Sequence, residues 1–462
     1  MAKRRDTYTA LLFLAGIFAA AIFLLIGLFP TPEFVLPGRP VRPTLRTRPS
    51  VIASATPEER ETMVRPLLRS VKGHLPTPIP TYEEVDAALM ERIDAAEPAV
   101  NELLDREHTF IQLYGGVQRL LGRRVVEDAD PQYTVVKLTD QMLAFIDLES
   151  GQMDMTNRAQ EMIDFARRVR REFRTPVLYV QAPSKLNMAP LPEGITDYTD
   201  AEADQFLALL AEGKVDTLDL RPIFQDAAEE DPLAVERLFF HTDHHWTPEG
   251  AFLVYQALCE KLDKDYRFKI EEEWVDYDAF DRYTFEDVFL GSQGRRVGSL
   301  YAGLDDLEIW SPKFSTDFTY TVPIIGIERE GPFAISLLFP ERLSEKGYYT
   351  TNPYTIYAGG DYLLSRALNE KNPNGKRILI LRDSFGCALT PFLSIASQEV
   401  MAIDPRSFNG DQDIMMDFVD WLEPDLIIVM NTTGSLRVDK LYPYLPTARK
   451  AALAAKDAQR QS

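Results

Sequence analysis

The chain has few cysteines, few histidines and a deficit of positive charge. Its two cysteines, Cys259 and Cys387, are too few for a disulfide framework, so the fold must rely on its hydrophobic core. Lys and Arg number 50 against 71 Asp and Glu, and this excess of acids argues against a protein that tracks nucleic-acid phosphates. Of the 462 residues, 45% are hydrophobic and 26% are charged, which argues against global disorder and against a polytopic membrane protein.

Long apolar runs are also scarce, and the clear example lies near the N-terminus. Residues 9–29 carry no charge, and their length is close to the ~20 residues that cross a bilayer as a helix. Because Lys3, Arg4 and Arg5 precede the run, the positive-inside rule predicts a cytoplasmic N-terminus. A cleaved signal peptide is the alternative, although its apolar core is normally shorter. We expect a single-pass cell-membrane protein whose C-terminal part is extracytoplasmic.

Composition divides the chain into segments. Residues 1–30 form the expected cytoplasmic tip and transmembrane anchor, and the Pro- and Arg-rich residues 31–50 form an extended linker. Residues 51–130 are expected to be a helical lead-in, because apolar positions recur at spacings of three and four. Residues 131–462 form the main domain, in which the aromatic-, Thr- and Gly-rich stretch of about 266–361 predicts a β-rich insertion.

Short apolar runs in the main domain alternate with amphipathic helical patterns. The runs that are typical of buried parallel strands are 177–183, 215–220, 377–381, 400–404 and 425–430. Strands that alternate with helices imply a parallel sheet covered on both faces. The sequence therefore predicts an α/β fold, a three-layer, flavodoxin-like core of about five parallel strands that is interrupted by the β-rich insertion.

Three of the five histidines lie in the segment HTDHHW, which begins at His241. In an extended segment, Asp243 and His245 project from the same side, so the carboxylate can fix the tautomer and leave one ring nitrogen free as a base. Surface or packing histidines are one alternative, and a metal site is another. No HExxH motif and no second Cys/His cluster completes a metal ligand set, so we expect neither a metal nor an organic cofactor.

A serine marks the end of the expected strand 377–381. Ser384 lies where this strand turns into a helix, at the carboxyl end of the sheet, where open α/β folds bind their ligands. The first N–H groups of that helix, near Gly386, are suited to hold a developing oxyanion. A simple N-cap serine is the alternative, but the separate Asp243–His245 pair favours a nucleophile.

Other polar residues are candidates for the oxyanion hole or the substrate site. Asn431 follows the expected strand 425–430, where its amide either donates to an oxyanion or caps a turn. Arg295 and Arg296 lie in a glycine-rich loop, where they either contact an acidic or hydroxylated glycan or have no role. His244, next to the proposed base, is the last candidate, and we expect both cysteines to be buried thiols.

Four motifs together resemble the DHHW protein family: DHHW at 243–246, RDSFG at 382–386, GSQGRR at 291–296 and PSK at 183–185. That family is SGNH-hydrolase-like and is related to the extracytoplasmic proteins of alginate O-acetylation. The resemblance covers about residues 100–435. In ordinary SGNH enzymes the serine precedes the Asp–His pair, whereas here it follows, as it does in the alginate proteins.

The resemblance implies roles and partners. Asp243 corresponds to the orienting acid, His245 to the base and Ser384 to the nucleophile, whereas His244 falls on a variable position. The implied function is extracytoplasmic O-acetylation of a cell-envelope or secreted polysaccharide through an acyl-serine, with a membrane-bound O-acyltransferase as acyl donor. An acetylesterase acting on the same substrates, and a non-catalytic polysaccharide-binding or assembly protein, are the alternatives.

Overall fold

A computed structural model describes residues 108–438, apart from the short gaps 140, 232, 345–346 and 409–411. The predicted membrane segment, the linker and most of the lead-in lie outside these residues. Within the described part, residues 108–120 are helical. No helix among the described residues is long and apolar enough to span a membrane.

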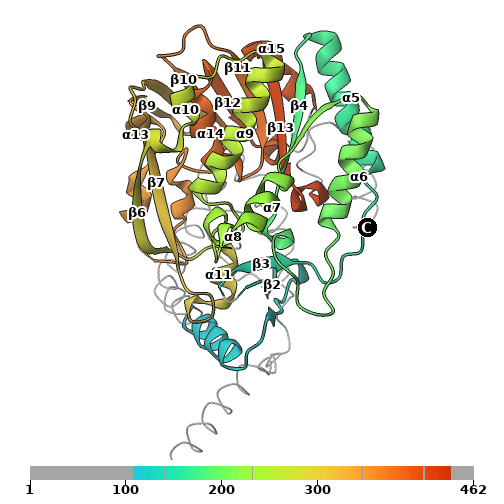
Figure 1. Cartoon of the computed structure of the whole chain (residues 1–462), viewed down its shortest axis with the longest axis vertical. Helices are drawn as coiled ribbons and strands as arrows, with labels where there is room; N and C mark the ends of the chain where they lie inside the picture. Colours follow the sequence, from blue (N-terminus) through green and yellow to red (C-terminus); the bar gives the residue numbers. More distant parts are fainter. Residues whose placement is uncertain (1–107, 140, 232, 345–346, 409–411, 439–462) are drawn as a thin grey trace, which may run out of the picture. The chain divides into compact units, whose positions relative to one another are not determined.

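A single eight-stranded sheet organises the fold (Figure 1). In spatial order its strands are β5 (Asp216–Asp219), β4 (Val177–Ala182), β13 (Leu426–Thr432), β11 (Arg377–Arg382), β12 (Glu399–Ile403), β10 (Leu364–Asn369), β8 (Phe318–Val322) and β9 (Ile327–Gly331). The first five run parallel, and β10, β8 and β9 continue the sheet antiparallel. The five predicted parallel strands are confirmed, and three antiparallel strands that were not predicted extend the same sheet.

The antiparallel part of the sheet comes from one region of the chain. β8 and β9 come from the stretch predicted as a β-rich insertion, and β10 follows directly after it. In β8, buried and half-exposed residues alternate, which is the pattern of a strand with one face on the core and one toward solvent. The same stretch supplies a separate antiparallel hairpin, β6 (Phe280–Phe289) and β7 (Asp305–Pro312), visible at the left of Figure 1.

The five parallel strands have the flavodoxin-like order, but the chain enters it at a different point. Numbered along the chain, their spatial order is 2-1-5-3-4. If β11 is instead counted first, the series β12, β11, β13, β4, β5 gives the flavodoxin order 2-1-3-4-5. When the chain starts at a different strand, the order of the strands in the sequence changes, but each strand still ends at the same edge of the sheet. The serine therefore follows the Asp–His pair in this sequence and still lies at the same edge as that pair.

Helices cover both faces of the sheet. The α-helices are α5 (Thr156–Glu172), α6 (Thr199–Glu212), α7 (Arg221–Glu230), α8 (Ala234–Leu238), α9 (Pro248–Tyr266), α10 (Glu272–Val275), α11 (Ser292–Val297), α12 (Ser299–Ala302), α13 (Phe333–Ser336), α14 (Gly386–Ile395) and α15 (Gln412–Leu422). α9 and α14 share a buried cluster with one face of the strands, and α5, α6 and α15 share another with the opposite face. This is the predicted three-layer arrangement.

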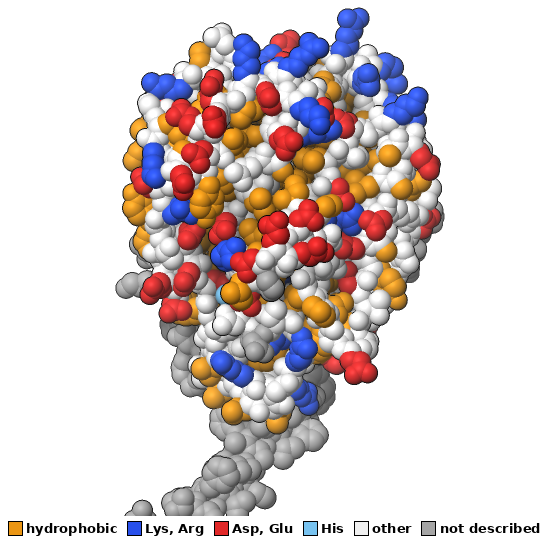
Figure 2. Space-filling model, in the orientation of Figure 1, with side chains coloured by type: hydrophobic (Ala, Val, Ile, Leu, Met, Phe, Trp, Pro, Cys, Tyr) orange, Lys and Arg blue, Asp and Glu red, His pale blue; other side chains and the backbone are white. Residues whose placement is uncertain are grey.

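Smaller elements surround this core. The strands β1 (Val125–Val126), β2 (Thr134–Lys137) and β3 (Leu143–Ile146) form a separate antiparallel sheet. The 3-10 helices are η1 (Pro131–Tyr133), η2 (Lys185–Asn187), η3 (Tyr277–Ala279), η4 (Pro323–Ile325), η5 (Pro340–Ser344), η6 (Pro353–Ile356), η7 (Pro405–Phe408) and η8 (Gly434–Arg437). Figure 2 shows acidic side chains across the middle of one face, which accords with the net negative charge of the chain.

Candidate active site

The turn between β11 and α14 presents Ser384 at the carboxyl end of the sheet. The Phe385 N–H donates to the Asp383 carboxylate (3.0 Å), and the Gly386 N–H donates to the Asp383 carbonyl (3.1 Å). Helix α14 starts immediately after Phe385, and all its residues are buried, so its position is fixed by packing. The turn is therefore held rigidly while Ser384 itself stays partly accessible.

Gly386 is needed for close packing. A Cβ atom built on it would lie 2.5 Å from the Cδ of Arg382, a buried side chain that passes beneath the turn. Its N–H already donates to the Asp383 carbonyl. This N–H therefore closes the turn, and the role of Gly386 as an oxyanion candidate stays a prediction.

The histidines lie on the segment between α8 and α9. A bridge between Phe239 and Trp246 closes this segment, and Trp246 is fully buried. The Thr247 side chain accepts the Gly250 N–H (3.2 Å) and caps α9, whose first residue is a proline. We call residues 241–246 the histidine loop; both of its ends are thereby fixed.

The histidine loop places its base against the serine. His245 Nε2 lies 2.7 Å from Ser384 Oγ, and His245 Nδ1 lies 2.5 Å from Asp243 Oδ1. Since an ionised carboxylate only accepts, Nδ1 carries the proton and Nε2 is left to accept the serine hydroxyl. Asp243 and His245 are both buried, so water does not compete strongly for these bonds. The structure thus brings together the three residues that the sequence singled out.

Asp243 is stabilised as an anion. Burial alone would raise its pKa, but the neighbouring His244 and His245 and hydrogen bonds to the carboxylate bring the pKa well below its usual value. One of these bonds comes from the Ser292 N–H, 2.7 Å from Asp243 Oδ2, at the start of α11. The GSQGRR motif therefore contributes a backbone N–H to the orienting acid.

Two buried side chains of opposite charge hold the backbone of the histidine loop. The Lys185 ammonium donates to the carbonyls of Phe240 (2.9 Å), His241 (3.3 Å) and Asp243 (2.5 Å). The Asp305 carboxylate accepts the His241 N–H (2.6 Å), the Thr242 N–H (2.8 Å) and the Thr242 hydroxyl (2.6 Å). Burial lowers the pKa of Lys185 to about 8, although Asp305 and Asp243 oppose this shift.

Sequence reasoning did not find the roles of Lys185 and Asp305. Lys185 belongs to the PSK motif, whose presence was noted without a function, and Asp305 begins β7 within the insertion. The available signal for the first was a lysine three residues after the end of the buried strand β4, followed by an apolar residue. Nothing in the local sequence marks the second.

His244 does not join the hydrogen-bonded chain from Ser384 to Asp243. Its Nδ1 lies 2.7 Å from Ser292 Oγ, and its ring packs on His245 at 3.8 Å between centroids. Burial and the adjacent His245 lower the pKa of His244, so the ring is neutral. Asp243, His244 and His245 could meet at a metal ion, but both nitrogens of His245 and both oxygens of Asp243 are already engaged.

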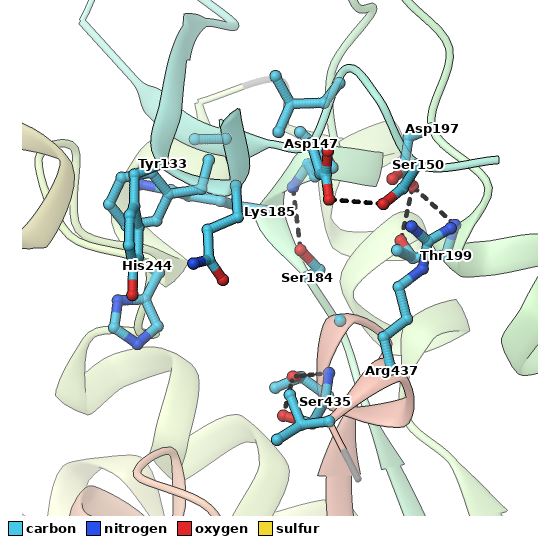
Figure 3. A pocket seen from close by; sticks show the side chains of 18 of the residues that line it. Tyr133, Asp147, Ser150, Ser184, Lys185, Asp197, Thr199, His244, Ser435 and Arg437 are labelled. Atoms are coloured by element: carbon cyan, nitrogen blue, oxygen red, sulfur yellow. Dashed lines mark hydrogen bonds between the residues drawn. The ribbon is translucent and has the colours of Figure 1, made fainter. Parts of the chain in front are cut away.

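Ser384 and His244 open into a cavity of about 720 Å³. Figure 3 shows its labelled walls, with Lys185 and His244 on one side and Ser435 and Arg437 on another. The wall is rich in hydroxyl, carboxylate and aromatic groups: Tyr133, Phe145, Asp147, Ser150, Asp197, Tyr198, Thr199, Phe385 and Ser435. Such a lining suits a hydroxylated ligand with an apolar face.

The remaining candidates lie away from this wall. Arg295 donates to the carbonyls of Leu290 and Thr351, and Arg296 pairs with Asp128 at 3.2 Å, so both arginines have structural partners. We expected Asn431 to lie just past the end of its strand, but it lies inside β13 and is buried. Its amide nitrogen has no hydrogen-bond partner among the described residues.

Both cysteines are free and buried, as predicted. Cys259 lies in α9 and Cys387 in α14. Burial raises the pKa of each thiol to about 12, so neither thiol competes with Ser384 as a nucleophile.

Comparison with known families agrees with this geometry. A family model described as the SGNH hydrolase-like domain of the acetyltransferase AlgX matches residues 145–275, and the DHHW protein model matches residues 233–403. Over these residues the chain is similar to the acetyltransferase domain of AlgX and to the DHHW proteins. Comparison with curated protein sequences gave no match.

Solved structures share the fold. A DHHW family protein from Eubacterium siraeum DSM 15702 is 19% identical with a TM-score of 0.51, and the match covers 69% of this chain and 97% of that one. Bacillus cereus PatB1 with a sulfonyl adduct is 17% identical with a TM-score of 0.53, covering 69% of this chain and 98% of that one. The fold is therefore α/β and SGNH-like, with a mixed sheet.

Proposed function

We propose that this chain is an extracytoplasmic O-acetyltransferase that modifies a cell-envelope or secreted polysaccharide through an acyl-Ser384 intermediate. The observation that carries the proposal is the unbroken chain of hydrogen bonds from Ser384 through His245 to Asp243, which opens into the 720 Å³ cavity. The match to an acetyltransferase domain supports acyl transfer as the class of chemistry.

In the first half-reaction, the Ser384 oxygen attacks the carbonyl carbon of an acetyl ester while His245 Nε2 takes the hydroxyl proton. Asp243 stabilises the imidazolium that forms. The tetrahedral intermediate expels the donor oxygen, which receives the proton from Nε2. The products are the acetyl-serine ester and the donor alcohol.

In the second half-reaction, an acceptor hydroxyl of the polysaccharide gives its proton to Nε2 and attacks the acetyl-serine carbonyl. Ser384 leaves and recovers the proton, so that the enzyme is restored. The Ser384 N–H has no hydrogen-bond partner in the described residues and is the backbone donor available to the oxyanion. If water replaces the sugar hydroxyl, the same steps give an esterase.

The acceptor class is supported by the lining of the cavity. Aromatic rings such as Tyr133 and Tyr198 offer flat apolar faces, and Asp147, Asp197 and Ser435 offer hydrogen-bonding groups. Sugar rings present both kinds of surface. In the proposed reaction, an acceptor glycan binds in this cavity during the transfer step. A membrane-bound O-acyltransferase is the expected source of the acetyl group.

The proposed location rests on the apolar residues 9–29 behind three basic residues. The protein should fractionate with membranes, and protease added outside spheroplasts should digest most of the chain. Complete protection of the folded part from external protease would contradict the proposed topology.

A serine-directed sulfonyl fluoride tests the chemistry directly. We expect one adduct per chain by intact-mass spectrometry, located at Ser384 by peptide mapping and missing from Ser384→Ala. Release of acetate from a chromogenic acetyl ester, measured with and without oligosaccharides, separates the two activities. Acetylated oligosaccharide indicates a transferase, and acetate release that acceptors leave unchanged indicates an esterase. If the folded wild type forms no adduct, the non-catalytic binding protein becomes the better description.

A further inference from the structure

Tyr354 contacts both reacting partners of the candidate site. It lies in η6, inside the β-rich insertion, and its side chain is almost completely buried. Its ring stacks on the imidazole of His245 with centroids 4.0 Å apart and planes 13° from parallel. The His244 ring also packs on His245, with centroids 3.8 Å apart and the planes tilted by 37°. The base is thus in contact with two neighbouring rings.

The hydroxyl of Tyr354 reaches residues 383–385, which lie between β11 and α14 and which we call the nucleophile turn. Its single proton is shared between the carbonyls of Ser384 (3.1 Å) and Phe385 (3.0 Å), both within hydrogen-bond distance of the hydroxyl oxygen. Burial raises the pKa of Tyr354 well above its usual value, so the hydroxyl remains a donor at any working pH. One rigid side chain therefore joins the backbone of the nucleophile to the ring of the base.

We propose that Tyr354 is a positioning residue that keeps the His245 ring in register with the Ser384 turn. The inference rests on the proposed function, because it assigns no other reaction to the site. Stacking holds the plane of the imidazole, within which the bond to Asp243 keeps Nε2 facing Ser384, and the Tyr354 hydroxyl limits movement of the turn toward or away from that nitrogen. A small error in this alignment has a large effect on rate, since a displacement of about 1 Å can cost ~10²-fold.

The segment that carries Tyr354 is itself well anchored. Tyr357, three residues later, is fully buried, accepts the Trp310 N–H (2.9 Å) and donates to the Glu308 carbonyl (3.1 Å). The Phe339 N–H donates to the Ile356 carbonyl (2.8 Å). Tyr357 thus resembles Tyr354 in burial and bonding but bonds to β7 instead of the nucleophile turn, and it provides a matched control.

The experiment compares Tyr354→Phe, Tyr354→Leu and Tyr357→Phe. Each variant is treated with the sulfonyl fluoride, and the maximal rate of labelling is separated from the probe's affinity. We expect Tyr354→Leu, which removes both contacts, to lower the maximal rate about 10²-fold with unchanged affinity. Tyr354→Phe keeps the stack and should lose about 3- to 10-fold. Tyr357→Phe should lower the melting temperature similarly but label at the wild-type rate.

Several outcomes overturn the inference. One is a folded Tyr354→Leu variant that labels as fast as wild type; another is an equal loss of labelling in Tyr357→Phe and Tyr354→Phe, which indicates a general packing effect. If Tyr354→Leu does not fold, Tyr354→Phe decides, and wild-type labelling there counts against the proposal. Failure of the wild type to react is a different result, because it removes the proposed function and this inference with it.

Discussion

The nucleophile turn and the histidine loop reach the same site by different means. The backbone of the nucleophile turn is closed by bonds that span two or three residues, such as the Phe385 N–H to the Asp383 carboxylate, and distant contacts from Tyr354 and Ser435 add to these bonds. The histidine loop is held by charges far away in the sequence, Lys185 and Asp305. The shape of the turn is therefore set largely by neighbouring residues, whereas the loop depends on the assembled fold. Substitutions should affect the two regions differently.

The largest effect should come from removing members of the hydrogen-bonded chain itself. Ser384→Ala, His245→Ala and Asp243→Ala should each reduce acyl transfer about 10³- to 10⁴-fold, with little loss of stability. Because the three act as a unit, the Ser384→Ala/His245→Ala double variant should be hardly slower than Ser384→Ala. Rates of acetyl-ester turnover measure this, and multiplicative losses in the double variant would show that the residues act independently.

The next largest effect should follow loss of the charged supports of the histidine loop. Lys185→Met leaves the carbonyls of Phe240, His241 and Asp243 without their donor, and we expect labelling of Ser384 to slow by about 10²-fold. Lys261→Met, which breaks a surface pair with Asp216, is the matched control and should leave the rate unchanged. Equal rates in Lys185→Met and wild type would mean that the histidine loop holds its shape without the ammonium.

In the nucleophile turn the expected effect is on stability. Gly386→Ala pushes a methyl group against the buried Arg382 side chain, which should lower the free energy of unfolding by about 1–3 kcal/mol in urea titrations. Gly151→Ala, where a new Cβ meets nothing within 4 Å, is the control and should be nearly neutral. If Gly386→Ala is as stable as Gly151→Ala, the packing beneath the turn is looser than the structure indicates.

A smaller, pH-dependent effect should also come from Lys185. Its pKa falls from 10.5 to about 8 on folding, so between these values the unfolded chain binds the proton and the folded chain does not. Stability should therefore rise with pH across this window, by roughly 1 kcal/mol per unit. Urea unfolding at pH 8 and pH 9.5 should show the rise in wild type and not in Lys185→Met. Parallel behaviour of the two proteins would contradict a buried ammonium.

The same contrast explains what the sequence could predict. The strand–serine–helix turn is local, so the apolar run before Ser384 was enough to place it, and the Asp243–His245 spacing was enough to pair the acid and the base. The five parallel strands were also visible as short apolar runs. The antiparallel extension by β8, β9 and β10 was not, because alternating patterns do not reveal which sheet edge a strand joins. Asp305 and Tyr354 were missed for the same reason: their contacts are long-range.

The smallest effect should be found at His244, which lies beside the base but outside the hydrogen-bonded chain. His244→Ala removes a ring that packs on His245 and a contact with Ser292, yet leaves the 2.7 Å contact between Ser384 and His245 in place. We expect labelling of Ser384 to slow by only about 2- to 5-fold, and a chelator to have no effect on wild type or variant. Ser292→Ala removes the contact without removing the ring, so it should be milder still. A loss in His244→Ala as large as that in His245→Ala, together with inhibition by a chelator, would instead indicate a metal ion held by Asp243, His244 and His245.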